Sequence, residues 1–299
     1  MKTRLTAALA VGALGLALTA CGGDPTEGEK SASDTITIGS AAFPENEIIA
    51  EIYAQALADK GIKVKKKLNI GAREAYIPAL KNGEIDLLPE YTGNLLTYLD
   101  KKATATSSED VVSALGEALP DNTEILDTAP AEDKDSLNVT AEFSQKEGVK
   151  SIADLKKVKG LKLAANPEFK ERPYGIPGLE KVYGITGVKF TPISDSGGPA
   201  TLKALLDGKV DVADIYSTTP SIIANKLVTL EDPKSLIAAQ NVVPLINSDK
   251  ATDEVKDVLN AVSKALTTKE LLELNEKNQG KDKVAPAELA KDWVAEYVK

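Results

Sequence analysis

The chain has 299 residues, 45 acidic and 36 basic, so its formal charge is −9 at neutral pH, which argues against nucleic acid or anionic lipid as a partner. Histidine is absent, which excludes Ser-His-Asp and Cys-His catalysis and zinc sites of the His-Glu-x-x-His type. There is no P-loop, dinucleotide fingerprint or cysteine cluster. We therefore expect no cofactor and no metal, and nothing in the composition indicates an enzyme.

Residues 1–20 predict a lipoprotein signal peptide. A basic start precedes an apolar run over residues 5–18, which is too short to span a membrane. The run ends in Leu-Thr-Ala-Cys, a pattern that looks like a bacterial lipobox, and Cys21 is the only cysteine. We expect Cys21 to be lipidated and residues 21–33, which contain almost no apolar side chains, to form a flexible tether. The protein is then expected outside the cytoplasm, held to the outer face of the cell membrane by lipid alone.

The rest of the chain alternates short apolar strands with helices, which is typical of an α/β protein. Strands are expected at residues 35–39, 64–70, 85–88, 137–139, 161–164, 188–192, 210–215 and 242–246. Helices are expected at residues 44–60, before Gly83, at 154–157, 178–183 and 199–206, and from 252 to 299 with breaks at Gly280 and Pro286.

One motif occurs twice, in segments 125 positions apart. Residues 79–92 read ALKNGEIDLLPEYT and residues 204–217 read ALLDGKVDVADIYS. Each copy indicates the end of a helix, a glycine suited to positive φ, a short strand, and a tyrosine followed by a hydroxyl residue. Tyr91 and Tyr216 would leave the carboxyl ends of strands, where open α/β sheets place ligands. We expect them to face each other across a cleft, although packing in a core is the simpler interpretation of a single copy.

The order of the elements predicts two lobes. Lobe 1 would comprise residues 34–137 and 243–299, and lobe 2 residues 138–242. The chain then crosses between the lobes twice, which predicts a hinge.

Six segments carry a resemblance to a known family: Ile38–Ser40 with Phe43 and Glu45, Leu68–Glu74, Pro89–Gly93, Phe169–Gly175, Lys181–Gly184, and Asp211–Thr218. From Ile36 to about Tyr297 the chain resembles the extracytoplasmic substrate-binding proteins of ABC importers for quaternary-amine osmoprotectants such as glycine betaine, choline and carnitine. The resemblance implies a two-lobed α/β fold of the periplasmic-binding-protein type II class, with the ligand in the cleft. It also implies a protein, which we expect to be a monomer, that closes on a small molecule and delivers it to a membrane permease driven by separate ATPase subunits.

The resemblance also implies a site. A trimethylammonium group cannot donate a hydrogen bond and is best held by aromatic faces, whereas its carboxylate suits an arginine. Tyr91 and Tyr216 match cage positions of the family, and Arg172 matches its carboxylate-binding arginine. The alternative for Arg172 is a salt bridge between the lobes or at the surface. Further contributors on the same loops would be Phe43, Ser40, Thr92, Ser217 and Thr218.

Two of the four cage tyrosines common in the family are replaced here, near Asp135 and Gln240. Asp135 would offer negative charge to a cation, and Gln240 would offer hydrogen bonds to a hydroxylated or larger ligand. Tyr174 stands where aspartate is frequent and would add an aromatic face.

Three alternatives therefore remain. The first is the same binding role for a non-quaternary, larger hydroxylated or aromatic ligand. The second is a secreted carboxylate-based hydrolase, for which Glu90 and Asp214 would be the acid pair. The third is a structural or adhesion lipoprotein with both tyrosines in its core. If the protein is instead a binding protein, we expect Tyr91→Ala and Tyr216→Ala each to weaken ligand binding and to leave the fold nearly intact.

Overall fold

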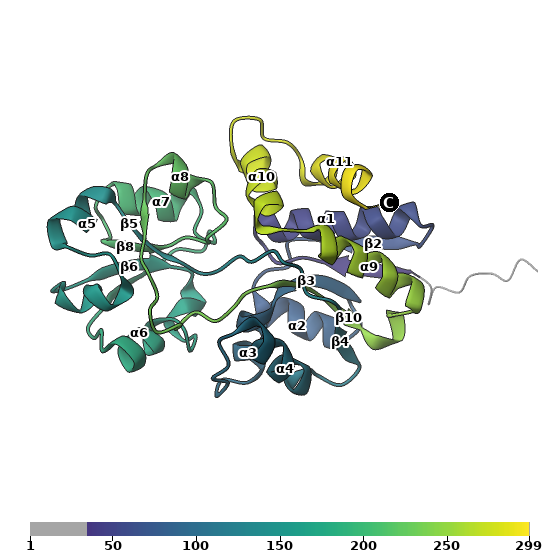
Figure 1. Cartoon of the computed structure of the whole chain (residues 1–299), viewed down its shortest axis with the longest axis horizontal. Helices are drawn as coiled ribbons and strands as arrows, with labels where there is room; N and C mark the ends of the chain where they lie inside the picture. The colour runs from purple at the N-terminus through teal and green to yellow at the C-terminus, as the bar shows by residue number, and fades with distance from the viewer. Residues whose placement is uncertain (1–34, 299) are drawn as a thin grey trace, which may run out of the picture. The chain divides into compact units, whose positions relative to one another are not determined.

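Two five-stranded sheets, each flanked by helices, make up residues 35–298, the part of the chain that the computed structural model describes (Figure 1). The predicted signal peptide, the tether and Cys21 lie outside the described residues. None of the helices in the described part of the chain combines the length and the apolar character needed to cross a membrane.

The first sheet has the strand order β2-β1-β3-β10-β4. Its strands are β1 (Ile36–Gly39), β2 (Val64–Lys67), β3 (Leu87–Tyr91), β4 (Thr123–Ile125) and β10 (Val242–Asn247). Strands β2, β1 and β3 are parallel, whereas β10 runs antiparallel to both β3 and β4.

The second sheet repeats this plan with the order β7-β6-β8-β5-β9. Its strands are β5 (Leu137–Val139), β6 (Lys162–Ala165), β7 (Lys189–Pro192), β8 (Val212–Asp214) and β9 (Val228–Thr229). Strands β7, β6 and β8 are parallel, and β5 is antiparallel to β8 and β9. The chain passes between the sheets through residues 126–136 and 230–241. The predicted α/β class with two crossovers is confirmed.

The α-helices are α1 (Pro44–Asp59), α2 (Arg73–Lys81), α3 (Thr92–Leu99), α4 (Ser108–Ala118), α5 (Ala141–Glu147), α6 (Ile176–Tyr183), α7 (Pro199–Leu206), α8 (Ser221–Ala224), α9 (Asp253–Ala265), α10 (Thr268–Gln279) and α11 (Pro286–Tyr297). The 3₁₀ helices are η2 (Ile152–Lys157), η3 (Pro167–Lys170) and η4 (Ser248–Lys250).

Some predicted elements were wrong or were missed. The strand expected at 64–70 ends at Lys67 because Asn69 adopts a positive φ of 56°. The helix expected at 154–157 is the 3₁₀ helix η2. Helices α3, α4, α5 and α8 and strands β4 and β9 were not predicted. For α4 a readable signal existed, because the Ser107 side chain accepts a hydrogen bond from the backbone N–H of Asp110 and so caps the helix.

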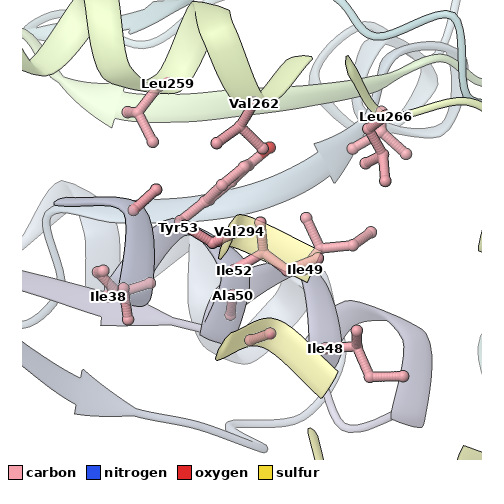
Figure 2. Close-up of a cluster of buried hydrophobic side chains, with 14 of the residues drawn as sticks. Ile38, Ile48, Ile49, Ala50, Ile52, Tyr53, Leu259, Val262, Leu266 and Val294 are labelled. Atoms are coloured by element: carbon pink, nitrogen blue, oxygen red, sulfur yellow. The ribbon is translucent and has the colours of Figure 1, made fainter. Parts of the chain in front are cut away.

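Helix α1 lies at the centre of the first half of the protein, packed against the C-terminal helices α9, α10 and α11. Its side chains are apolar around most of its circumference, which is typical of a helix buried on several sides. Figure 2 shows Tyr53 and Ile52 of α1 in one cluster with Val262 of α9 and Val294 of α11. The C-terminal helices therefore pack on α1, beside the first sheet.

The repeated motif has the same structure in both copies. Gly83 and Gly208 follow α2 and α7 with positive φ values of 71° and 67°. Three residues further on, the Asp86 carboxylate accepts a hydrogen bond from the backbone N–H of Thr37 at 2.8 Å, and Asp211 does the same for Lys162 at 2.8 Å. Each aspartate thus holds the neighbouring parallel strand in register, which explains why helix, glycine, aspartate and strand recur at fixed spacing.

Candidate functional site

A cavity of about 300 Å³ is lined by residues from both sheets and from the first crossover. The first-sheet side contributes Phe43, Arg73, Tyr76, Tyr91 and Asn94, among others. The second contributes Asn166, Glu168, Phe169, Arg172, Tyr174, Asp214 and Tyr216, and the crossover contributes Asp133 and Asp135. Of the predicted site residues, the structure brings together Tyr91, Tyr216, Arg172, Phe43, Tyr174 and Asp135 around this cavity.

Three aromatic rings meet in the cavity wall. Phe43, the residue before α1, lies between Tyr91 and Tyr216, with ring centroids 5.9 Å and 5.4 Å away. The Tyr216 ring meets Phe43 edge-on, at an interplanar angle of 72°. The Tyr216 hydroxyl accepts a hydrogen bond from the Asn166 side chain at 3.0 Å, which fixes the ring's orientation. The repeated tyrosines therefore approach one space from different sheets, as expected for a cleft.

Tyr91 also belongs to the hydrophobic core of the first half, and only 5% of its surface is exposed. Its hydroxyl donates a hydrogen bond to Glu45 at 2.8 Å, and burial followed by the charge of Glu45 raises its pKa. Tyr91 therefore combines the two interpretations that the sequence left open, since it packs in a core and lines the cavity.

Glu45 joins the two halves of the protein beside this cavity. Its buried carboxyl group accepts hydrogen bonds from Tyr91, from the Thr218 hydroxyl at 2.5 Å and from the Asn275 amide at 2.6 Å. Burial raises the pKa of Glu45 in spite of these bonds. Burial, and then the charge of Glu45, raises the pKa of Asp133 as well. We conclude that this carboxyl pair retains a proton more readily than exposed carboxyl groups do.

Arg172 connects the halves at another point of the wall. It forms a salt bridge with Glu74 of α2 at 2.9 Å, and its guanidinium lies 5.3 Å from the ring centre of Tyr98 in α3. Its Nε is buried and has no hydrogen-bond partner among the described residues. The salt bridge that the sequence left open as an alternative is thus present, while the Nε donor of the same side chain has no partner among the described residues.

Asp135 and Asp214 form an acidic part of the wall. Both are buried, and the pKa of Asp214 is raised by burial first and then by the charge of Asp135 and a hydrogen bond between the two side chains. Asn94 donates to Asp135 at 2.7 Å, and the backbone N–H of Ser136 donates to Asp214 at 3.2 Å. The position where the family commonly has a tyrosine therefore holds half of a carboxyl pair.

Five predicted site residues do not line the cavity and have partners within the protein: Ser40, Thr92, Ser217, Thr218 and Gln240. The Ser40 hydroxyl accepts from the Asn69 N–H, and Thr92 donates to a carbonyl of the second crossover. Gln240 exchanges hydrogen bonds with the backbone and side chain of Asn94. It therefore positions the residue that also holds Asp135.

The structure adds wall residues that the sequence did not single out as ligand-binding. Arg73 is held by Glu90 through two hydrogen bonds of 2.9 Å and 2.7 Å, and Tyr76 donates to the same carboxylate. Asn94 directly follows the Tyr-Thr-Gly end of the first repeat. This position in the sequence could have identified it as a residue of the cavity wall. Because Glu90 is occupied by Arg73 and lies outside the cavity wall, it does not form the acid pair with Asp214 that a hydrolase was expected to need.

A second cavity, of about 600 Å³, lies next to the first and shares Phe43, Asp133, Ser196 and Tyr216 with it. It is otherwise bounded by the start of α7, by α8 and by the end of α10. Glu45, Thr218 and Asn275 line this second cavity, so their hydrogen bonds close the wall behind the aromatic rings.

An α/β fold of two matching sheets, crossed twice by the chain and enclosing a cavity lined from both, defines a solute-binding protein of the periplasmic-binding-protein class. The chain belongs to the family described as the substrate binding domain of ABC-type glycine betaine transport systems, which matches residues 34–296. It is therefore the substrate-binding protein of an ABC transporter. Members of this family are extracytoplasmic solute-binding proteins and not enzymes.

Characterised relatives agree with this assignment. The chain is 27% identical over 258 residues to the glycine betaine-binding protein YehZ of Escherichia coli, covering 82% of this chain and 85% of the relative. It is 25% identical over 230 residues to a glycine-betaine-binding protein of Pseudomonas aeruginosa, covering 73% of each. A solved glycine betaine/carnitine/choline ABC transporter structure shares the fold, with a TM-score of 0.68, 24% identity, and coverage of 87% of this chain and 98% of that one.

Proposed function

We propose that this protein captures a small osmoprotectant of the glycine betaine, choline or carnitine type by closure of its two lobes and delivers it to the permease of an ABC importer. The observation that carries the proposal is the set of rings from Phe43, Tyr91 and Tyr216 on one cavity that Arg172, with its buried and unpartnered Nε, also lines.

The aromatic rings would hold the cationic end of the ligand. A methylated ammonium group is attracted to ring faces by roughly 0.5–2 kcal/mol for each ring, depending on how fully it is desolvated. Tyr216, Tyr91 and Phe43 lie close enough together to contact one such group. The nearness of these rings supports the proposed cage, although the wall formed by Asp135 differs from the pattern that the resemblance implies.

Arg172 would hold the carboxylate of a zwitterionic ligand. Its Nε is buried without a partner, and such a donor is costly to leave unpaired. A ligand carboxylate would supply the missing acceptor. Glu74, which is more than half exposed, shares the same guanidinium and would help hold it in place.

The proposed lobes keep the predicted boundaries, with residues 34–137 and 243–299 in lobe 1 and residues 138–242 in lobe 2. Closure would bring Thr218 to Glu45, Arg172 to Glu74 and Tyr216 to Phe43. The closed surface would then be recognised by the permease. We further propose that the protein acts as a monomer and is held at the outer face of the cell membrane by lipid on Cys21.

Calorimetric titration of the purified protein with glycine betaine, choline, carnitine and proline betaine tests the proposal. We expect micromolar or tighter binding of at least one of them, weakened by Tyr216→Ala. The absence of both heat and a thermal shift with all four would overturn the proposed ligand class and leave the family assignment standing.

A further inference from the structure

The cavity contains a carboxyl pair where an aromatic cage would need a ring. Asp135 and Asp214 come from the first crossover and from the end of β8, and they are only 8% and 3% exposed. Each uses one oxygen to accept a bond from within the protein, Asp135 from Asn94 and Asp214 from the Ser136 N–H. The two side chains also share a hydrogen bond with each other, and the lone pairs that this leaves are the acceptors that this wall can offer to a ligand.

The charges around the pair are unbalanced. Four acidic residues line the cavity, namely Asp133, Asp135, Asp214 and Glu168, against the two arginines Arg73 and Arg172. Both arginines already form ion pairs with other carboxylates, Glu90 and Glu74. Among the described residues, neither Asp135 nor Asp214 takes part in an ion pair with a basic side chain. A buried carboxyl pair of this kind needs either a shared proton or a cation.

The pair lies within reach of the aromatic wall. The negative charges of Asp135 and Asp214 contribute to the raised pKa values of Tyr174 and Tyr216, for which burial is the larger cause. In the opposite carboxyl pair, both Glu45 oxygens accept from Tyr91, Thr218 and Asn275. One Asp133 oxygen accepts from the Ser217 hydroxyl and from the backbone N–H of Thr218. Asp135 and Asp214 line the same cavity as Tyr216 and are therefore buried acceptors that a cation held against Tyr216 would meet.

We propose that this cavity selects a zwitterion whose ammonium group retains at least one N–H, which donates to the Asp135–Asp214 pair while Arg172 holds the carboxylate. A protonated amine makes a short charge-assisted hydrogen bond to a carboxylate, whereas a fully methylated ammonium places methyl groups against the same oxygens and leaves them unpaired. This inference rests on the proposed function, because it names the chemical class of ligand for the same site.

A methylation series tests the inference without changing the carboxylate end. Glycine betaine has no N–H, dimethylglycine has one and sarcosine has two, and all are zwitterions at pH 7. We expect the purified protein to bind dimethylglycine or sarcosine about tenfold or more tightly than glycine betaine in calorimetric titrations. Glycine betaine binding as tightly as dimethylglycine and sarcosine, or more tightly, would overturn the inference while leaving the proposed function intact. No binding of any of the three would overturn the inference, and the proposed function would then depend on the titrations with choline, carnitine and proline betaine.

Two variants connect the preference to the pair. Asp135→Asn and Asp214→Asn keep the size of each side chain and remove one charge. We therefore expect the affinity for dimethylglycine or sarcosine to come within about threefold of the affinity for glycine betaine. The matched control Asp257→Asn makes the same substitution on the exposed face of α9 and should keep the full preference. An unchanged ratio in both folded pair variants would contradict the inference. If either variant fails to fold by circular dichroism, the wild-type series alone decides.

Discussion

Thr218 donates a hydrogen bond to Glu45 at 2.5 Å across 173 positions of sequence, and it thereby joins the loop after β8 in the second sheet to the first turn of α1. Asn275 of α10 donates to the same Glu45 oxygen and to the carbonyl of Thr218. This contact ties the second sheet to the C-terminal helices that pack on the first.

The first prediction concerns this contact. Thr218→Val removes the hydroxyl but keeps the shape, and we expect it to weaken ligand binding by about fivefold, the equivalent of about 1 kcal/mol. Because the bond joins the lobes, the melting temperature of the unliganded protein should change by no more than about 2 °C. Titration with the tightest-binding member of the methylation series checks the affinity, and thermal unfolding without ligand checks the melting temperature. Thr218→Ser should behave as the wild type, and an equal loss in this variant would show that the hydroxyl is not responsible.

The second prediction separates the two ends of the ligand. Arg172→Gln removes the buried Nε donor, so we expect the affinity for glycine betaine or dimethylglycine to fall by about 10–100-fold. Choline has no carboxylate, and its affinity should stay within about threefold of the wild-type value. Glu74→Gln breaks the salt bridge but leaves Nε in place, and it should cost less than Arg172→Gln. A parallel loss for choline would argue that Arg172 acts only as a link between the lobes.

The third prediction corrects an expectation from the sequence. The tyrosines were expected to tolerate alanine without loss of folding, but Tyr91 is part of the core around α1. We expect Tyr91→Ala to cost about 3 kcal/mol of stability, whereas Tyr216→Ala, outside that cluster, should cost less and mainly reduce binding. Urea unfolding and titration measure the two effects. Tyr91→Phe keeps the ring and is the matched control, so a large loss of affinity in that variant would show that the hydrogen bond to Glu45 is what binding requires.

The fourth prediction follows from the raised pKa of Asp214, which burial causes first and the charge of Asp135 reinforces. A carboxyl group with a raised folded-state pKa contributes stability that is present below its unfolded pKa and is lost as pH rises through the folded pKa. Asp214→Asn cannot titrate, so its melting temperature relative to the wild type should increase between pH 5 and pH 8. Thermal unfolding of both proteins across this range, without ligand, checks the sign. A constant difference would show that Asp214 is ionised throughout this range, and a decreasing one would contradict the raised pKa.

The fifth prediction tests the repeated turn. Gly83 and Gly208 have positive φ and open space where a Cβ atom would stand, so alanine meets only the backbone cost. We expect Gly83→Ala and Gly208→Ala each to lower the free energy of unfolding by about 1 kcal/mol. Gly116→Ala, in the last turn of α4 with equally open surroundings, should instead raise it by about 0.5–1 kcal/mol. Unequal effects at Gly83 and Gly208 would contradict the equivalence of the two copies.

Local sequence determined the secondary structure elements and turns whose conformation depends on a few neighbouring residues. Helix α1 with its proline start, the two glycine turns and the apolar strands all follow from conformational preferences that act over a few positions. The duplicated motif placed Tyr91 and Tyr216 at the carboxyl ends of equivalent strands in the two sheets, because the same helix–glycine–strand unit directs the chain in the same way in both copies. The family and the two-sheet fold could therefore be predicted from sequence.

The environment of each site residue was decided only by the tertiary structure. Arg172 and Glu74 are 98 positions apart, and the partners of Gln240 and Thr218 lie still further away along the chain. Whether Asp135 would be a solvated charge or half of a buried pair with Asp214 depended on how the crossover lies against β8. Burial and hydrogen bonding between distant segments set charge and exposure, and these are the quantities that separate a cage for quaternary amines from a site for an N–H donor.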